Sequence, residues 1–307
     1  MKTTTPPKPT HYIDLLSDYG FKRVFGSDPN KDLLIHFLNE VFQGRKRITD
    51  IQYEKNEHPG DGPEQGAVIF DLLCTGDQGE KFLIEVQREK QKHFSHRAYV
   101  YGSRLVSGLV PDGDRTEWRY QIPETYIISI LENFSIDSED KQYLSVFSTR
   151  NEVSNKILKG SSTYIFIELR NFVKTLTELR SDLDKWLYVL KNMSRMNKIP
   201  QYLKKAVFQK LFQISAYVNL SEEEKKMYNK SIKYQWDLAN IIDTATEEGF
   251  EQGEIKGEAR GRGEGRTEGK AEVVSNLILK SSLTDQQIAE MANMEVELVK
   301  AIRKELQ

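Results

Sequence analysis

The sequence is poor in cysteine, in long apolar runs and in excess charge of either sign, and each shortage excludes a class of protein. Cys74 is the one cysteine among 307 residues, which excludes an internal disulfide framework and a cysteine-based zinc finger. No 18 apolar residues run together, and the N-terminus lacks the apolar core of a secretory signal, so we expect a cytoplasmic protein without a membrane span. The formal net charge of −2 gives no global basic field, so a nucleic-acid partner would need a local patch, a bound metal, or both.

Apolar residues make up 38% of the chain, enough for a sizeable core, and their pattern changes along it. Helical spacing of apolar residues predicts helices over 30–42 and 94–109, and helical patterning runs from 172 to about 245. Runs of β-forming residues predict strands at 48–54, 67–74, 81–87, 125–131, 143–148 and 163–169. This order predicts an α/β fold, with a mixed sheet core flanked by helices.

The two ends of the chain differ from this core. We expect residues 1–11 to be a disordered lead and residues 12–245 to form the α/β domain. Within 246–275, glycine recurs at every fourth position from Gly249 to Gly269. A glycine in a helix costs roughly 1 kcal/mol relative to alanine, so six of them need a benefit, such as close approach of another helix. The alternative is a flexible, charged and solvated spacer.

Residues 280–307 have the pattern of two short helices. Thr284 is placed to cap the first helix, with Gln287 at the capping-box position. Asn293 can take the left-handed turn conformation between the helices. The segment is therefore similar to a helix-turn-helix, which would either read DNA or serve only as a packing unit.

Two acidic residues carry the clearest chemical signal in the sequence. Asp71 and Glu85 each sit in a short apolar run, and the glycine-rich segment 75–79 between the runs predicts a β-hairpin. Burying two carboxylates on neighbouring strands is unfavourable unless positive charge lies between them. A hard divalent metal such as Mg²⁺, with Mn²⁺ as an alternative, fits because it prefers oxygen ligands and leaves room for phosphate.

Two neighbours of Glu85 complete this candidate site. The carbonyl of Val86 is a possible third metal ligand. Gln87 lies on the same strand face as Glu85 because side chains alternate along a strand, so it can hold water or phosphate beside the metal. The alternative is an exposed hairpin whose acids face solvent, but the apolar neighbours of both acids favour the metal site.

Asp71, followed by Glu85-Val86-Gln87, resembles the PD-(D/E)XK nuclease signature, with glutamine in place of the usual lysine. More specifically, the chain resembles the recombination-promoting nuclease/putative transposase family, over about residues 12–270. The stretches that carry this resemblance, besides the two acidic runs and the glycine-rich tail, are Ser17–Lys22 with Phe25-Gly26, Asn30–Asn39, and Phe94–Arg97 with Tyr101.

The resemblance implies a restriction-endonuclease-like core and Mg²⁺-dependent DNA cleavage linked to recombination. It implies that Asp71 and Glu85 bind metal and that Gln87 completes the site. Asp18 matches an acidic position on the first helix that can join the metal shell. Its alternative role is a helix N-terminal charge or an i+4 partner for Lys22.

The chain departs from the parent signature at two positions. Phe70 stands where a proline usually precedes the first acid, which matters little. The missing lysine leaves open what stabilises charge on the attacking water, and Lys22 or Arg97 could serve. Arg97 and Tyr101, one helical turn apart, could contact phosphate or simply pack against the core.

A small basic run follows the second acid. Arg88, Lys90 and Lys92 alternate with polar residues, in a position that suits contact with a DNA backbone. Such a run is also common on an ordinary solvated face.

We therefore expect a Mg²⁺-dependent DNA endonuclease of low sequence specificity. Cutting two strands needs two sites, so a homodimer or transient pairing through the C-terminal region is expected. A second hypothesis is a catalytically silent DNA-binding or assembly protein that keeps the fold, which the missing lysine supports. A third is a transposase that joins strands as well as cutting them.

Overall fold

The computed structural model describes residues 11–55, 57–58, 68–110, 121–137 and 139–306. The chain divides into two compact units, Met1–Asp237 and Leu238–Gln307. The expected disordered lead falls outside the described residues, except for His11. The first unit contains the α/β core and every predicted site residue.

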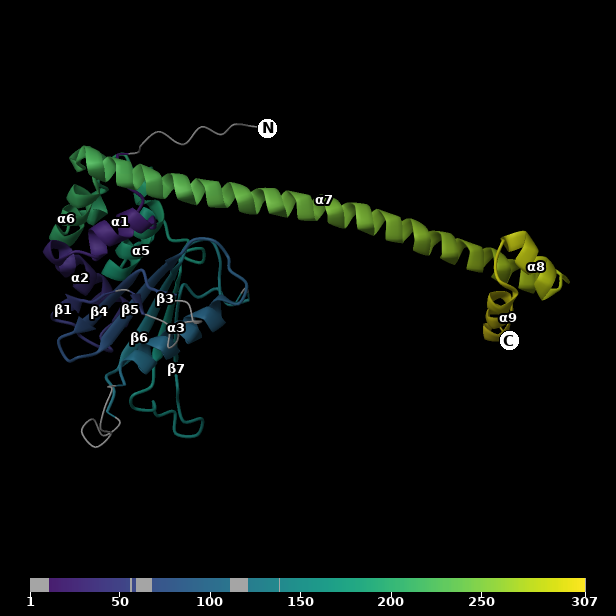
Figure 1. Ribbon diagram of the computed structural model, residues 1–307, viewed down its shortest axis with the longest axis horizontal. Helices are drawn as coiled ribbons and strands as arrows, with labels where there is room; N and C mark the ends of the chain where they lie inside the picture. The colour runs from purple at the N-terminus through teal and green to yellow at the C-terminus, as the bar shows by residue number, and fades with distance from the viewer. Residues whose placement is uncertain (1–10, 56, 59–67, 111–120, 138, 307) are drawn as a thin grey trace. The chain divides into compact units, whose positions relative to one another are not determined.

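A six-stranded mixed sheet forms the centre of the first unit (Figure 1). Its order is β1-β4-β5-β6-β8-β7. β1, β4 and β5 are antiparallel, β5, β6 and β8 are parallel, and β7 returns antiparallel to β8. The strands span Ile51–Tyr53 (β1), Leu72–Gly76 (β4), Lys81–Gln87 (β5), Thr125–Leu131 (β6), Leu144–Ser148 (β7) and Thr163–Glu168 (β8). The mixed sheet confirms the predicted fold class, and the near-continuous burial of β6 matches its β-branched sequence.

Helices cover both faces of this sheet (Figure 1). Alternation along β5 assigns the faces, since Phe82 and Ile84 pack into the larger core and Leu83 packs with α3. Glu85 shares the face of Leu83. The helices of the larger core are α1 (Asp18–Phe25), α2 (Lys31–Phe42), α5 (Asp182–Asn192) and α6 (Ala206–Ser215), and the opposite face carries α3 (Phe94–Gly108). Short 3-10 helices span Asp28–Asn30, Leu176–Glu178, Met193–Arg195, Gln201–Leu203 and Tyr217–Asn219.

The predicted strand 67–74 is divided into two strands by Phe70 and Asp71. Val68–Ile69 (β3) pairs with Glu57–His58 (β2) in a separate two-stranded sheet. The chain bends at Asp71 before β4 begins at Leu72, so this acid lies at the end of the strand and not within it. Residue 67 lies outside the part that the structure describes.

Helix α7 (Glu222–Lys280) is continuous through the glycine-rich segment. Six glycines of α7, from Gly249 to Gly269, recur at every fourth position. A Cβ added at any of them would meet no atom of the described residues within 4 Å, apart from neighbouring backbone of α7 itself. No described helix combines the length and the apolar character that a membrane crossing requires.

The second unit ends in α8 (Asp285–Ala292) and α9 (Val296–Glu305), which pack with the end of α7 around Val274, Ile288 and Val299. Thr284 and Gln287 form the predicted capping box, and Asn293 takes the predicted left-handed conformation with φ of 49°. The two predicted helices are confirmed.

Candidate active site

The two predicted acids meet at one end of the β4–β5 hairpin. Leu72 pairs with Ile84, so the next step of the antiparallel register places Asp71 opposite Glu85. The Asp71 backbone N–H donates to Glu85 Oε1 at 3.1 Å, and the Val86 N–H donates to Asp71 Oδ2 at 2.7 Å. The chain bends at Asp71, just beyond the last β4–β5 residue pair, Leu72 with Ile84. At this bend the Asp71 side chain accepts the hydrogen bond from the Val86 N–H of β5.

Glu85 is buried and Asp71 is partly buried, and burial disfavours the ionised forms of both carboxylates. Burial raises the pKa of Asp71, against the hydrogen bond from Val86 and the charge of Lys22. Burial and then the charge of Asp71 raise the pKa of Glu85 to about 8. Ionising both acids at neutral pH therefore requires added positive charge, which is the condition that a divalent cation meets.

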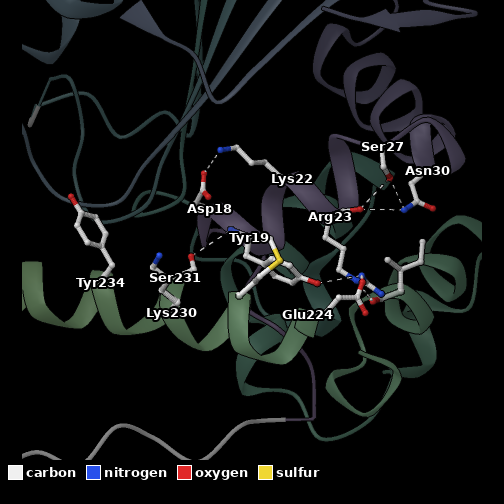
Figure 2. Close-up of a pocket in the computed structure, with 12 residues that line it drawn as sticks. Asp18, Tyr19, Lys22, Arg23, Ser27, Asn30, Glu224, Lys230, Ser231 and Tyr234 are labelled. Atoms are coloured by element: carbon white, nitrogen blue, oxygen red, sulfur yellow. Dashed lines mark hydrogen bonds and ion pairs between the residues drawn. The ribbon is translucent and has the colours of Figure 1, made fainter. Parts of the chain in front are cut away.

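Helix α1 brings a second acid and a lysine near this pair. Ser17 caps the helix by accepting from the Gly20 N–H, which sets Asp18 in the first turn. Asp18 forms an i, i+4 ion pair with Lys22 at 2.6 Å (Figure 2). The charges of both residues act on Asp71, opposing each other in their effect on its pKa. The charge of Asp18 thus acts on Asp71, while the Asp18 carboxylate itself contacts Lys22.

Helix α3 supplies a cation on the other side. Arg97 Nη2 lies 3.7 Å from Glu85 Oε2, and Arg97 Nη1 donates to Gln87 Oε1 at 3.4 Å. Arg97 Nε donates to the Tyr101 hydroxyl at 2.9 Å, and Tyr101 packs edge-on against Phe70. Arg97 therefore spans Glu85 and Gln87, and Tyr101 has a packing role whether or not it also contacts phosphate.

A family model described as PD-(D/E)XK nuclease family transposase matches residues 15–245. The chain belongs to this family. The match covers the sheet, the helices of both faces and every predicted site residue. Comparison with curated proteins and with solved structures finds no match.

The PD-(D/E)XK signature is named for two acids and a lysine, and the sequence prediction places Gln87 at the position of this lysine. Gln87 Nε2 donates to the carbonyl of Glu89 at 3.1 Å, so its amide is fixed by protein groups at both ends. A neutral amide cannot provide the charge that a lysine would. Arg97 and Lys22 are the cations whose charges act on both carboxylates.

The donor set of this family member fits a hard divalent cation. Asp71 and Glu85 offer carboxylate oxygens from adjacent backbone segments, and Val86 lies between Glu85 and Gln87 in the same strand. The roles of Asp18, Asp71, Glu85, Val86 and Gln87 as ligands or catalytic groups stay predictions.

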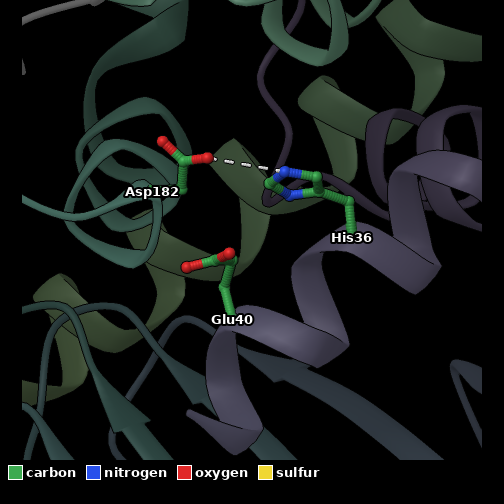
Figure 3. A group of neighbouring side chains, drawn as sticks. All are labelled: His36, Glu40 and Asp182. Carbon is green, nitrogen blue, oxygen red and sulfur yellow. Dashed lines mark ion pairs between the residues drawn. The ribbon is translucent and has the colours of Figure 1, made fainter. Parts of the chain in front are cut away.

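A second acidic cluster, which the sequence pattern did not predict, lies in the same unit. His36, Glu40 and Asp182 each offer a ligand atom within 4.8 Å of the others (Figure 3). However, Trp186 Nε1 donates to His36 Nδ1 at 2.9 Å. Nδ1 is then the acceptor nitrogen and the neutral imidazole keeps its proton on Nε2, which faces Asp182 Oδ2 at 3.6 Å.

The charge of Asp182 is compensated by lysines. Lys185 lies 2.8 Å from Asp182 Oδ1, and Lys205 contacts Oδ2. Burial alone would raise the pKa of Asp182, but the hydrogen bonds from these lysines outweigh it and lower the pKa. The cluster ties α2 to α5, and we assign it no metal. The i, i+4 spacing of His36 and Glu40 is the one signal that the sequence offered.

The predicted basic run is wrong at its first residue. Arg88 Nη1 donates to Asp14 Oδ2 at 2.6 Å and to Gln235 Oε1 at 2.8 Å, and Arg88 Nη2 donates to Glu132 Oε1 at 3.1 Å. Arg88 thus anchors the chain after β5 to its surroundings and is not free for DNA. Lys90 and Lys92 are exposed.

A buried serine beside Glu85 was also missed. Ser129 of β6 is the register partner of Glu85 and is 1% exposed. Within the described part of the chain, its hydroxyl has no hydrogen-bond partner. An unsatisfied buried hydroxyl is unfavourable, so Ser129 is an available donor to a ligand of Glu85 or to Glu85 itself.

Proposed function

We propose that Asp71 and Glu85 hold one divalent cation, Mg²⁺ or Mn²⁺, and that this chain hydrolyses DNA phosphodiester bonds with low sequence specificity. The observation that carries the proposal is the meeting of the buried carboxylate of Glu85 with the partly buried carboxylate of Asp71 at one end of the β4–β5 hairpin. Their ionised forms need a cation, and the family to which the chain belongs is one of nucleases. We further propose that the cleavage promotes DNA recombination.

The chain's own residues have distinct tasks in this proposal. A bound divalent cation polarises a phosphoryl oxygen and lowers the pKa of a bound water. Asp71 and Glu85 fix the position of the cation, and the Val86 carbonyl offers a third oxygen. Gln87, held by Arg97, orients water or phosphate beside it.

Cations around the carboxylates suit the phosphate backbone. Lys22 and Arg97 have half-exposed or partly exposed side chains, and their charges already act on Asp71 and Glu85. With Tyr101, they are the residues that we propose contact DNA. Contacts of this kind go to phosphate and carry no sequence information, which supports low specificity.

The test is nicking of supercoiled plasmid by the full chain with Mg²⁺, compared with Asp71→Ala and Glu85→Ala. The wild-type chain should nick the plasmid, and both variants should lose the activity. Mg²⁺ should also raise the melting temperature of the wild-type chain, by an amount that grows with its concentration, and leave the variants unchanged. Equal nicking by all three proteins would remove the assignment.

A second candidate is a catalytically silent DNA-binding or assembly protein, because Gln87 cannot supply the positive charge of the usual lysine. In that case Mg²⁺ would stabilise the wild-type chain and DNA would bind, but no nicking would follow. The plasmid assay and the melting temperature therefore separate the two candidates.

We propose that two copies of the chain pair through the C-terminal region, because cutting both strands of a duplex needs two sites. The open glycine stripe of α7 supports this, since among the described residues no atom beyond the neighbouring backbone of α7 lies within 4 Å of the Cβ position of any of these glycines. Residues 246–275 would then form the contact and residues 280–307 a small helical segment beside it. Gly257→Leu and Gly261→Leu should shift a dimer toward monomer in light scattering. A wild-type monomer would favour the solvated-spacer alternative.

A further inference from the structure

A groove of about 1020 Å³ lies between α1 and the first turns of α7 (Figure 2). Its lining is largely apolar, and the side chains that provide the apolar surface are Tyr19, Ile214, Met227 and Tyr234. Tyr234 is 70% exposed and Met227 is 60% exposed. Large apolar side chains in a concave and open place indicate a binding surface.

The groove adjoins the candidate active site. Asp18 and Lys22 line it, and the charges of the same two residues act on Asp71. Lys22 also acts on Glu85. A DNA strand whose phosphate lies at the two carboxylates therefore has its neighbouring nucleotides within reach of the groove.

The charges of the lining suit a nucleic acid. Two of its three cations have acidic partners, since Lys22 pairs with Asp18 and Arg23 pairs with Glu224. Lys230 is exposed and has neither an ion-pair nor a hydrogen-bond partner within the described residues. Lys230 lies next to Ser231 and one helical turn before Tyr234, so a free cation stands beside an exposed aromatic ring (Figure 2).

We propose that this groove binds an unpaired nucleotide of the DNA strand next to the cleaved phosphate, with the base against Tyr234 and Met227 and a phosphate near Lys230. The inference deepens the proposed nuclease function and rests on it. In a duplex the faces of the bases are covered by stacking on their neighbours, so paired DNA offers no base face for the apolar groove to contact. An exposed base face on an aromatic side chain contributes about 1–3 kcal/mol, whatever the sequence.

If the groove binds an unpaired nucleotide, the enzyme prefers DNA of a particular structure but of no particular sequence. DNA with an unpaired segment, such as a flap or a junction, would fill both the carboxylate site and the groove. Intact duplex would fill only the carboxylate site. An apolar peptide is the competing occupant of such a groove, and it would make the groove indifferent to DNA.

Binding is tested on the full-length chain in EDTA, so that the result does not depend on cleavage. The probes are fluorescein-labelled oligothymidylate of about 12 nucleotides, a length within the usual site sizes, and a duplex of the same length. Tyr234→Ala should weaken binding of the single strand by about tenfold and leave duplex binding unchanged. Tyr202→Ala, which removes another exposed tyrosine outside the groove, should change neither.

Lys230→Gln adds a second readout. It should reduce the slope of log K against log salt for the single strand by about 0.7, the value for one phosphate contact. Equal loss on single strand and duplex with Tyr234→Ala, or no loss on either, would overturn the proposal. Because Tyr234 is exposed, its truncation should leave the fold intact, and an unchanged melting temperature verifies that the variant is folded.

The nuclease assay separates this inference from the proposed function. Preferential cutting of a flap over a duplex, lost in Tyr234→Ala while duplex cutting persists, supports both. Nicking by the wild-type chain without any effect of Tyr234→Ala overturns the groove and leaves the nuclease. Absence of nicking together with Tyr234-dependent binding of the single strand supports the groove and removes the nuclease.

Discussion

Two clusters of acidic side chains lie in the first compact unit, and they differ in what surrounds the carboxylates. Around Asp182, two lysines compensate the negative charge, and the pKa of this aspartate is lowered. Around Asp71 and Glu85, burial dominates, and both pKa values are raised. Both clusters bring acidic side chains close together, so closeness alone does not identify a metal site. The feature that identifies it is negative charge that the lysines and arginines of the protein do not fully compensate.

The largest expected difference between the clusters is in cleavage. Glu85→Gln keeps the shape of the side chain and removes one metal-binding charge, so we expect nicking to fall by about a thousandfold. Asp182→Asn should leave nicking unchanged, because the charge it removes is already compensated. Initial rates of plasmid nicking with Mg²⁺ measure both. A comparable loss in the two variants would break the comparison.

Removing a cation should also affect cleavage at the first cluster and not at the second. Lys22→Met removes a charge that acts on both carboxylates, and we expect cleavage to fall by about a hundredfold with the fold intact, since Lys22 is half exposed. Lys205→Met removes an exposed partner of Asp182 and serves as the matched control, with cleavage retained. Full activity of Lys22→Met would leave Arg97 as the cation that replaces the missing lysine.

Local pattern was enough to predict much of this structure. Alternation and a glycine-rich turn predicted the hairpin that pairs Asp71 with Glu85, and the Thr284 capping box predicted the start of α8. The bend at Asp71 was not predicted, because Val68–Ile69 pairs with a segment that the sequence pattern did not identify as a strand. A short apolar run does not specify which partner it will pair with.

Contacts between distant segments account for the remaining differences. Arg88 looked like part of a basic run, but Asp14 and Gln235 reach it from far along the chain in both directions. The groove needs α1 and α7 side by side, and the second acidic cluster needs α2 beside α5. Periodicity identifies the helices and their apolar faces but does not specify which helices become neighbours.

The clusters should affect stability with opposite signs. The folded-state pKa of Glu85 is raised from 4.5 to about 8, so between these pH values the unfolded chain binds fewer protons than the folded one. Stability of the metal-free protein should therefore fall as pH rises through this window and level off above it. Glu85→Gln removes the effect, and at pH near 8 it should be more stable than wild type by on the order of a few kcal/mol.

We expect the opposite dependence of stability on pH from Asp182, because its folded-state pKa is lowered. Its contribution is present above the unfolded pKa and is lost as pH falls, so Asp182→Asn should cost about 1 kcal/mol at neutral pH and less in acid. Urea unfolding in EDTA across this pH range measures both variants. Two results together would contradict the assignment of Glu85 as an uncompensated acid. The stability of the wild-type protein would rise between pH values of about 5 and 8, and Glu85→Gln would be less stable than wild type throughout this range.

The smallest effect concerns two serines, one beside each cluster. Ser181 caps α5 by accepting from the Asp184 N–H at 3.0 Å, so Ser181→Ala should cost about 1 kcal/mol. Ser129 makes no hydrogen bond within the described residues, so Ser129→Ala loses none and should change the free energy of unfolding of the metal-free protein by less than about 0.5 kcal/mol. Urea unfolding compares the two variants. A clear loss in Ser129→Ala would mean that its hydroxyl already donates to Glu85, and the first cluster would then be partly compensated, as the second is.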